Sequence, residues 1–160
     1  MEKMIHHLRR SQQLSCDLDT AWNFFSSPDN LARITPKDLH FVVLTKFDKE
    51  GIYEGLTVDY TVTPLLGITL RWKTRITQVM NKKSFTDNQQ KGPYKYWNHF
   101  HEFIPNGEGV LMRDSVDYDL PLGFIGEIFH WLVVRKKLQN IFDFRVKVLD
   151  ELFNSPKKDI

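Results

Sequence analysis

Residues 85–123 read FTDNQQKGPYKYWNHFHEFIPNGEGVLMRDSVDYDLPLG, and this stretch decides the fold of the chain. It predicts two long strands that turn at Asn106-Gly107, because an Asn-Gly pair between alternating runs is a strong hairpin signal. Every second side chain of a strand points to the same face. One face of the first strand therefore carries four side chains: Trp97, His99, His101 and Phe103. If this face is buried, it is an aromatic wall with two polar rings, each of which requires a partner.

The second strand of the hairpin carries a carboxylate, Asp114, on its apolar face. The other side chains of that face are apolar or aromatic: Val110, Met112, Val116, Tyr118 and Leu120. A two-residue loop would pair His99 with Asp114, whereas a four-residue loop would pair His101 with it. Directly opposed side chains lie about 4.5–5.5 Å apart at Cβ, so either register brings the carboxylate within reach of a histidine.

This polar cluster allows four interpretations. It can be a structural cluster in which Asp114 orients a histidine, since buried polar groups are paired in proteins. It can be the polar end of an apolar ligand cavity. A histidine held by a carboxylate can act as a general base, although no serine or cysteine nucleophile motif accompanies it. A His-x-His pair with an aspartate offers three metal ligands, but no fourth ligand stands out. We therefore assign no metal and no catalytic residue.

The N-terminal third predicts one strand and two short helices. A strand is expected over residues 4–15. The next helix is capped by Asp17 or Asp19, whose carboxylates can accept from unpaired backbone N–H groups. Its buried face is formed by residues at helical spacing: Leu18, Trp22 and Phe25. Ser27-Pro28 ends it, and Asp29 is expected to cap the second helix.

The rest of the chain predicts further strands and one long helix. Strands are expected over residues 39–47, 56–63, 68–76 and 84–90, with turns at 48–51 and 65–67. Residues 123–153 lack proline and have no glycine after Gly126. Apolar residues recur there at helical spacing. A helix of this length spans roughly 45 Å, enough to cross a whole sheet.

These elements predict one α+β domain over residues 1–160, with a six- to seven-stranded antiparallel sheet, two short helices after the first strand and a long C-terminal helix. The chain is 41% hydrophobic and 26% charged, which is a globular composition. Aromatic residues make up 13% of it, which fits either a core of large side chains or a wide apolar cavity.

Charge and cysteine usage limit the classes of partner. The formal net charge is +2, so we expect no nucleic-acid partner. Cys16 is the sole cysteine, which excludes an intrachain disulfide. The first ten residues lack the apolar core of a signal peptide, and no apolar run approaches the ~20 residues of a membrane span. A cytoplasmic location is therefore expected.

The hairpin and its flanks resemble the START/helix-grip (SRPBCC) superfamily, which includes polyketide cyclases and lipid-transfer proteins. The resemblance is greatest to a bacterial ligand-binding subgroup labelled cell-division-inhibitor-like, and covers about residues 5–153. Its motifs are similar to F-x-D-x-Q, G-P, W-x-H-x-H-x-F and D-x-V-x-Y-x-L-P-x-G. Here they are represented by Phe85, Asp87, Gln89, Gly92, Pro93, Trp97, His99, His101, Phe103, Asp114, Val116, Tyr118, Leu120, Pro121 and Gly123.

The resemblance implies a helix-grip fold, in which a curved sheet wraps around the long helix and encloses a cavity for an apolar small molecule. We expect a binding protein for a lipid, isoprenoid, polyketide or aromatic compound, without a cofactor, as a monomer or weak homodimer. The expected ligand-binding residues are Trp72, Trp97, His99, His101, Phe103, Asp114 and Tyr118. The alternative is a cyclase, dehydratase or hydrolase with a His-Asp pair as general base. A regulatory partner is a third class, for which an exposed apolar patch on the long helix would be the sign.

Overall fold

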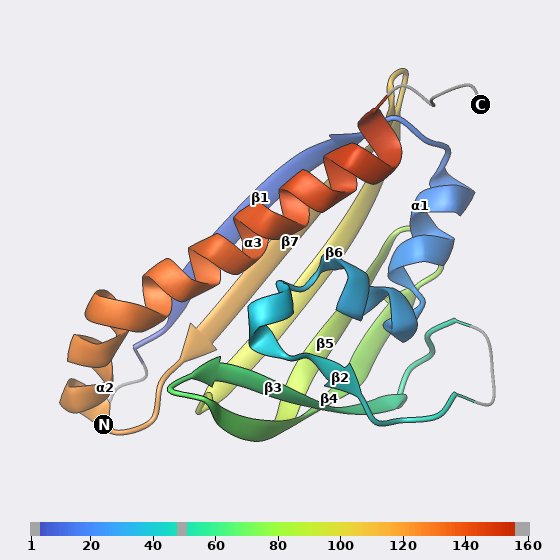
Figure 1. Ribbon diagram of the computed structural model, residues 1–160. Coiled ribbons are helices and arrows are strands. Elements are labelled where there is room, and N and C mark those ends of the chain that lie inside the picture. The colour runs from blue at the N-terminus through green and yellow to red at the C-terminus, as the bar shows by residue number, and fades with distance from the viewer. Residues whose placement is uncertain (1–3, 48–50, 156–160) are drawn as a thin grey trace.

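The computed structural model describes residues 4–47 and 51–155. Its centre is a seven-stranded antiparallel sheet in the order β1-β7-β6-β5-β4-β3-β2, with the C-terminal helical segment lying across one face (Figure 1). The strands are β1 His6–Leu14, β2 Val42–Val43, β3 Thr57–Leu65, β4 Ile68–Met80, β5 Ser84–Lys91, β6 Tyr96–Asn106 and β7 Gly109–Asp119. The expected fold class is confirmed.

Strand periodicity places the apolar faces as expected. In β6 the buried side chains alternate with half-buried ones from Trp97 to Phe103, and in β7 they alternate from Val110 to Tyr118. The polar Asp114 belongs to the buried set of β7. One face of the hairpin is therefore interior over its whole length.

Three short helices follow β1 and pack beside the sheet. Helix α1 spans Leu18–Phe25, and the Asp17 carboxylate accepts from Thr20 N at 2.7 Å, which confirms one of the two expected caps. The second expected helix is the 3₁₀ segment η1, Pro28–Ile34. The predicted cap at Asp29 is wrong, since η1 begins one residue earlier at Pro28, whose ring suits the first helical position. A further 3₁₀ turn, η2, covers Lys37–Leu39.

The C-terminal segment is one continuous run of helix. It comprises α2 Gly123–Phe129, the π-helical turn η3 His130–Val134, α3 Arg135–Leu149 and the π-helical turn η4 Asp150–Asn154. The long helix expected over residues 123–153 is confirmed. Two π turns interrupt its regular hydrogen bonding, a feature that the hydrophobic period does not reveal.

Two expected details differ from the structure. The strand expected over 39–47 is reduced to the two residues of β2, because η2 and an extended loop take up the rest. The hairpin turns at Gly107–Glu108, one residue later than predicted, with Asn106 paired to Gly109. This register places His101, not His99, opposite Asp114. The turn expected at 48–51 lies mostly outside the described residues.

Polar contacts attach both ends of the helical segment to the sheet. At the α2 end, Glu127 accepts from His6 Nε2 at 3.0 Å, and the Tyr118 hydroxyl lies 2.9 Å from His130 Nε2. At the other end, Asn154 Nδ2 donates to the Gln13 backbone carbonyl at 2.8 Å. Between these ends, Arg10 Nη2 donates to Asp143 at 3.2 Å and Gln12 Nε2 donates to the Val146 backbone carbonyl at 2.8 Å, so β1 also holds the middle of α3.

A substitution at Gly109 would test the hairpin geometry. The φ of Gly109 is +127°, and a Cβ there would lie 2.2 Å from the backbone oxygen of Leu14. We expect Gly109→Ala to lower the free energy of unfolding by at least about 2 kcal/mol, because both the strain and the backbone clash must be relieved. Gly107→Ala is the control, since a Cβ there meets nothing within 4 Å. Equal stability of the two variants in urea unfolding would contradict this hairpin.

Candidate functional site

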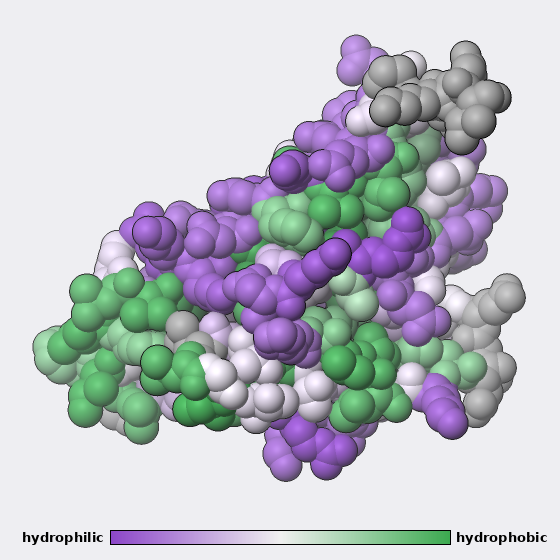
Figure 2. Space-filling view, in the orientation of Figure 1, coloured by the Kyte–Doolittle hydropathy of each residue, from purple (hydrophilic) through white to green (hydrophobic). Residues whose placement is uncertain are grey.

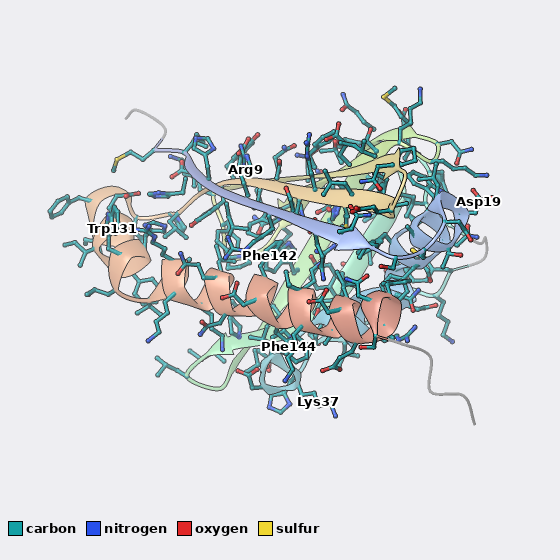
Figure 3. The ribbon with its side chains drawn as sticks, turned by 90° about the horizontal axis from the view of Figure 1, so that it is seen from above. Arg9, Asp19, Lys37, Trp131, Phe142 and Phe144 are labelled. Atoms are coloured by element: carbon teal, nitrogen blue, oxygen red, sulfur yellow. The ribbon has the colours of Figure 1, made fainter. Side chains whose placement is uncertain are left out.

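A cavity of about 660 Å³ lies between the sheet and the helical segment. Its floor comes from β3, β4, β5 and β6, and its roof comes from α2 and α3, with α1 and η1 on one side. Aromatic rings supply much of the wall: Phe24, Phe25, Phe41, Tyr60, Trp72, Phe85, Tyr94, Trp97, Phe129 and Phe142. Figure 3 shows Phe142 on the side of α3 that faces the strands.

Two histidines and two carboxylates form a closed polar cluster at this wall. His99 Nε2 donates to Asp114 Oδ1 at 2.8 Å, and His101 Nε2 donates to Asp87 Oδ2 at 2.9 Å. The remaining ring nitrogens also face carboxylates: His101 Nδ1 lies 3.0 Å from Asp114 Oδ1, without a hydrogen-bonding angle, and His99 Nδ1 lies 3.8 Å from Asp87 Oδ2. Each histidine therefore lies between two carboxylates, which gives each ring a fixed orientation.

Arg145 connects this cluster to the roof. Its Nη2 lies 3.5 Å from Asp114 Oδ1, and its side chain is 8% exposed. The guanidinium also lies over the rings of Phe25 and Phe142, with its central carbon 5.4 and 5.7 Å from their centroids. A buried guanidinium between two aromatic rings requires an anionic partner, and Asp114 supplies it.

The surroundings of the two histidines shift their pKa values in opposite directions. Burial and the neighbouring His101 lower the pKa of His99 below its ordinary value. Burial also opposes charging of His101, but its contacts with Asp114 and Asp87 outweigh this and raise its pKa. Burial would raise the pKa of Asp114, yet Arg145 and the two histidines hold it well below its usual range. The site therefore contains a His99 that is harder to protonate than a free imidazole beside a His101 that holds its proton more strongly than a free imidazole does.

Several proteins of known structure share this architecture. No protein-family model matches the chain, and no curated protein matches it. A START superfamily protein from Mycobacterium smegmatis aligns with a TM-score of 0.68 at 12% identity, over 93% of this chain and 97% of its own. Ginseng (Panax ginseng) major latex-like protein 151 aligns with a TM-score of 0.67 at 16% identity, over 95% and 99%. Norcoclaurine synthase from Thalictrum aligns with a TM-score of 0.65 at 16% identity, over 95% and 98%.

The chain has the helix-grip fold of START superfamily proteins. At these identities the likeness establishes the fold alone.

This helix-grip protein brings most of the expected site residues together. Trp72, Trp97, His99 and His101 line the cavity. Asp114 lies behind the two histidines, outside the lining, and acts on the cavity through them.

Two expected site residues lie elsewhere in the helix-grip fold. Phe103 is absent from the cavity lining and packs beneath α1, with its ring 5.6 Å from that of Trp22. Tyr118 is also absent from the lining and contacts His130 of the helical segment. The strand period placed both residues on the correct face but could not tell which part of that face the cavity occupies.

Sequence reasoning missed Arg145, and it did not anticipate that the expected wall residue Trp72 presents an unpartnered donor. Arg145 lies three residues after Phe142 and four before Leu149, so it occupies the buried stripe of α3, a pattern that could have revealed it. Trp72 Nε1 is a buried donor of the cavity wall that has no hydrogen-bond partner within the described part of the chain. Such a donor is a site for a ligand acceptor atom.

Two groups of residues bring metal-ligating atoms within 4.8 Å of one another: Asp87, His99 and His101, and also His6, Glu127 and His130. In the first group, Asp87 Oδ2 lies 2.9 Å from His101 Nε2 and 3.8 Å from His99 Nδ1. These distances lie on either side of the roughly 3.3 Å that separates two ligand atoms around a tetrahedral zinc ion. In the second group, the rings of His6 and His130 are stacked 3.6 Å apart with planes only 16° apart, so one ion cannot lie in the planes of both rings. Only the first group suits one ion. The absence of a metal from the site stays a prediction.

Asp114→Asn tests the cluster. We expect the free energy of unfolding to fall by about 3 kcal/mol or more at pH 7, because Arg145 would lose its buried partner. The folded pKa of Asp114 lies below the unfolded one, so its stabilisation is complete above the ordinary aspartate pKa of about 3.9 and is lost as the pH falls below it. The difference in free energy of unfolding between wild type and variant should therefore shrink in acid. The part that comes from charged His101, whose folded pKa is raised, should be lost as the pH rises through that pKa.

Asp117→Asn is the matched control for this variant. Asp117 lies three residues further along β7 and pairs with the half-exposed Arg9 at 2.6 Å, so its loss should cost about 1 kcal/mol or less. A destabilisation as small as this in Asp114→Asn would show that the cluster does not hold the helix.

Proposed function

We propose that this protein binds a hydrophobic small molecule, such as a lipid, isoprenoid, polyketide or aromatic compound, in the cavity between sheet and helix. The observation that carries the proposal is a cavity of about 660 Å³ with a mainly apolar wall, rich in aromatic rings, and one polar cluster. Ligand sites of small molecules typically measure 300–1,000 Å³ and combine an apolar wall with a few polar groups. Apolar burial at roughly 25 cal/mol per Å² would drive binding.

The distribution of polarity along the cavity supports an elongated ligand with one polar end. From Phe129 to Arg145 the roof extends over sixteen residues of helix, roughly 24 Å. Its cavity-facing residues are apolar for most of this length: Val134, Leu138, Ile141 and Phe142. The exception is Lys137, whose ammonium pairs with Asp38 at 2.9 Å. The cationic Arg145 and the two histidines lie toward the inner end. A hydrocarbon chain or fused ring system would fill the apolar part, with an oxygen atom at the cluster or at Trp72 Nε1.

The remaining expectations are part of the same proposal. No helix within residues 4–47 and 51–155 is long and apolar enough to cross a bilayer. We propose a cytoplasmic binding protein that needs no cofactor and acts as a monomer or weak homodimer.

Filling the cavity tests this function. Ile141→Trp adds a large ring to the roof and should weaken binding of a dansyl-labelled fatty acid at least about tenfold, since most of the ligand's buried apolar area is lost. Asn140→Trp, on the exposed neighbouring position, is the matched control. Direct excitation of the dansyl group, whose emission rises in an apolar cavity, reports binding independently of the tryptophan that each variant adds. Native mass spectrometry of the wild type as purified from cells should show added mass. If the wild type neither binds the probe nor retains added mass, the proposal is refuted.

A second candidate is an enzyme that uses the two histidines as a base and an acid. The unequal pKa directions of His99 and His101 favour it, because paired groups whose pKa values are driven apart are suited to opposite proton transfers. His99, with Nε2 donating to Asp114, has Nδ1 free to accept a proton. The Thalictrum norcoclaurine synthase, solved as a point mutant in complex with a transition-state analogue, is an enzyme of this fold.

NMR titration of the imidazoles tests this assignment. His99 should titrate below the ordinary histidine pKa of about 6.5, and His101 should titrate above it. Asp87→Asn should lower the pKa of His101, because one of its two carboxylate partners is removed, whereas Asp117→Asn should leave it unchanged. Two histidines that titrate together near 6.5 would rule out this acid–base division.

A further inference from the structure

The start of the helical segment exposes large apolar side chains to an unusual degree. They include Leu122, Phe124, Ile125, Phe129, Trp131 and Leu132, which are between 45% and 78% exposed. Figure 2 shows hydrophobic surface gathered at the end of the molecule where α2 and the β3–β4 turn lie, and Figure 3 shows Trp131 at the same end. Soluble monomers rarely leave contiguous apolar surface of this kind without a binding role.

This surface coincides with the mouth of the cavity. Most residues that line the cavity are buried or half-buried, and the exposed ones mark where it opens. The exposed lining residues are Ile68, Pro121, Leu122, Ile125 and Phe129. They lie on two segments, the start of β4 and residues 121–129, which comprise α2 and the two residues that precede it. We call these residues, together with Phe124, Trp131 and Leu132, the mouth patch. A ligand that enters the cavity must therefore cross this apolar surface.

The charges around the mouth patch are positive. Between Leu120 and Phe142 the only acidic residue is Glu127. Its side chain is 13% exposed and pairs with His6. Arg135 and Lys136 are exposed directly after the patch. The turn segment from Tyr60 to Trp72 contains no acidic residue and carries the exposed Arg71.

We propose that the mouth patch docks on the surface of an anionic lipid bilayer. Apolar side chains of a helix insert into the boundary between headgroups and acyl chains, and neighbouring lysine and arginine side chains are attracted to anionic lipids. Trp131, with Arg135 4.8 Å above its ring, has the amphipathic character of an interfacial anchor. Docking would bring the cavity mouth against the bilayer, so that an apolar ligand passes between the two without crossing water. This last step rests on the proposed ligand-binding function, whereas docking itself does not.

A bilayer fits the patch better than a second protein. A protein partner would gain the same apolar contact, but it would close the only wall of the cavity that is exposed among the described residues. The exposed Arg71 and Lys136, which have no ion pair with a carboxylate of the described residues, also favour an anionic surface. A second copy of this chain would bring the same positive charges together.

Vesicle flotation tests the docking. The full chain should float with vesicles of phosphatidylcholine that contain phosphatidylserine, and less with phosphatidylcholine alone. Phe124→Ser with Leu132→Ser, neither of which lines the cavity, should reduce binding about tenfold or more. The matched control is Leu44→Ser with Met80→Ser, two exposed apolar residues away from the mouth, which should bind as the wild type does.

A second pair of variants tests the charge. Lys136→Glu should weaken binding to the anionic vesicles roughly fivefold or more, and added salt should reduce the effect. Lys147→Glu, exposed at the far end of α3, should have no effect. Failure of the wild type to bind either vesicle would overturn the proposal. So would equal binding by the Phe124 and Leu132 double variant. A dimer in sedimentation velocity that this double variant abolishes, without vesicle binding, would assign the patch to a second copy.

Ligand uptake separates this proposal from the ligand-binding function. The double variant should still bind the dansyl-labelled fatty acid from solution, but should extract it from vesicles more slowly than the wild type does. Vesicle binding without any uptake of the probe would refute ligand binding of this class and leave docking intact. Uptake from solution without vesicle binding would refute docking alone.

Discussion

The rest of the structure depends on the contacts that the Asp114 carboxylate makes with two imidazoles and a guanidinium. One carboxylate of β7 contacts His99 and His101 of β6 and Arg145 of α3. All four groups are buried, so none can exchange its partners for water without a large desolvation cost. The cluster therefore fixes the orientation of both imidazoles and connects the sheet to the helix that covers it.

The cavity follows from how the helix is supported. Two hydrophobic clusters pack against it, one that includes Leu149 near α1 and another that includes Val134, Leu138 and Phe142. Polar contacts attach its outer ends through Glu127 and Asn154. A helix held in this way spans the sheet without collapsing onto β3 and β4, and the aromatic side chains beneath it form walls around a void. The same arrangement leaves α2 projecting beyond the sheet, which exposes the apolar residues at the cavity mouth.

Stability and ligand recognition draw on the same groups. His99 and His101 each donate from Nε2 to a buried or half-buried carboxylate, and they also line the cavity. A ligand can therefore be oriented by a polar surface that is already organised, which reduces the entropy lost on binding. The same buried side chains belong to the protein core and to the candidate site. A substitution in the cluster can therefore change both the free energy of unfolding and the affinity for a ligand, and both must be measured.

The sequence by itself determined the strand and helix pattern, the interior face of the hairpin and the meeting of two histidines with a carboxylate. These properties are local, because the side-chain periods of strands and helices are set by backbone geometry. The tertiary structure alone decided the hairpin register, since the choice of Gly107–Glu108 over Asn106-Gly107 as the turn moves every cross-strand pair. It also decided which side chains face the void, so that Phe103 packs beneath α1 while Asp87 and Arg145 join the histidines. Such partners come from segments distant in the chain, and only the packing of the helix on the sheet brings them within reach.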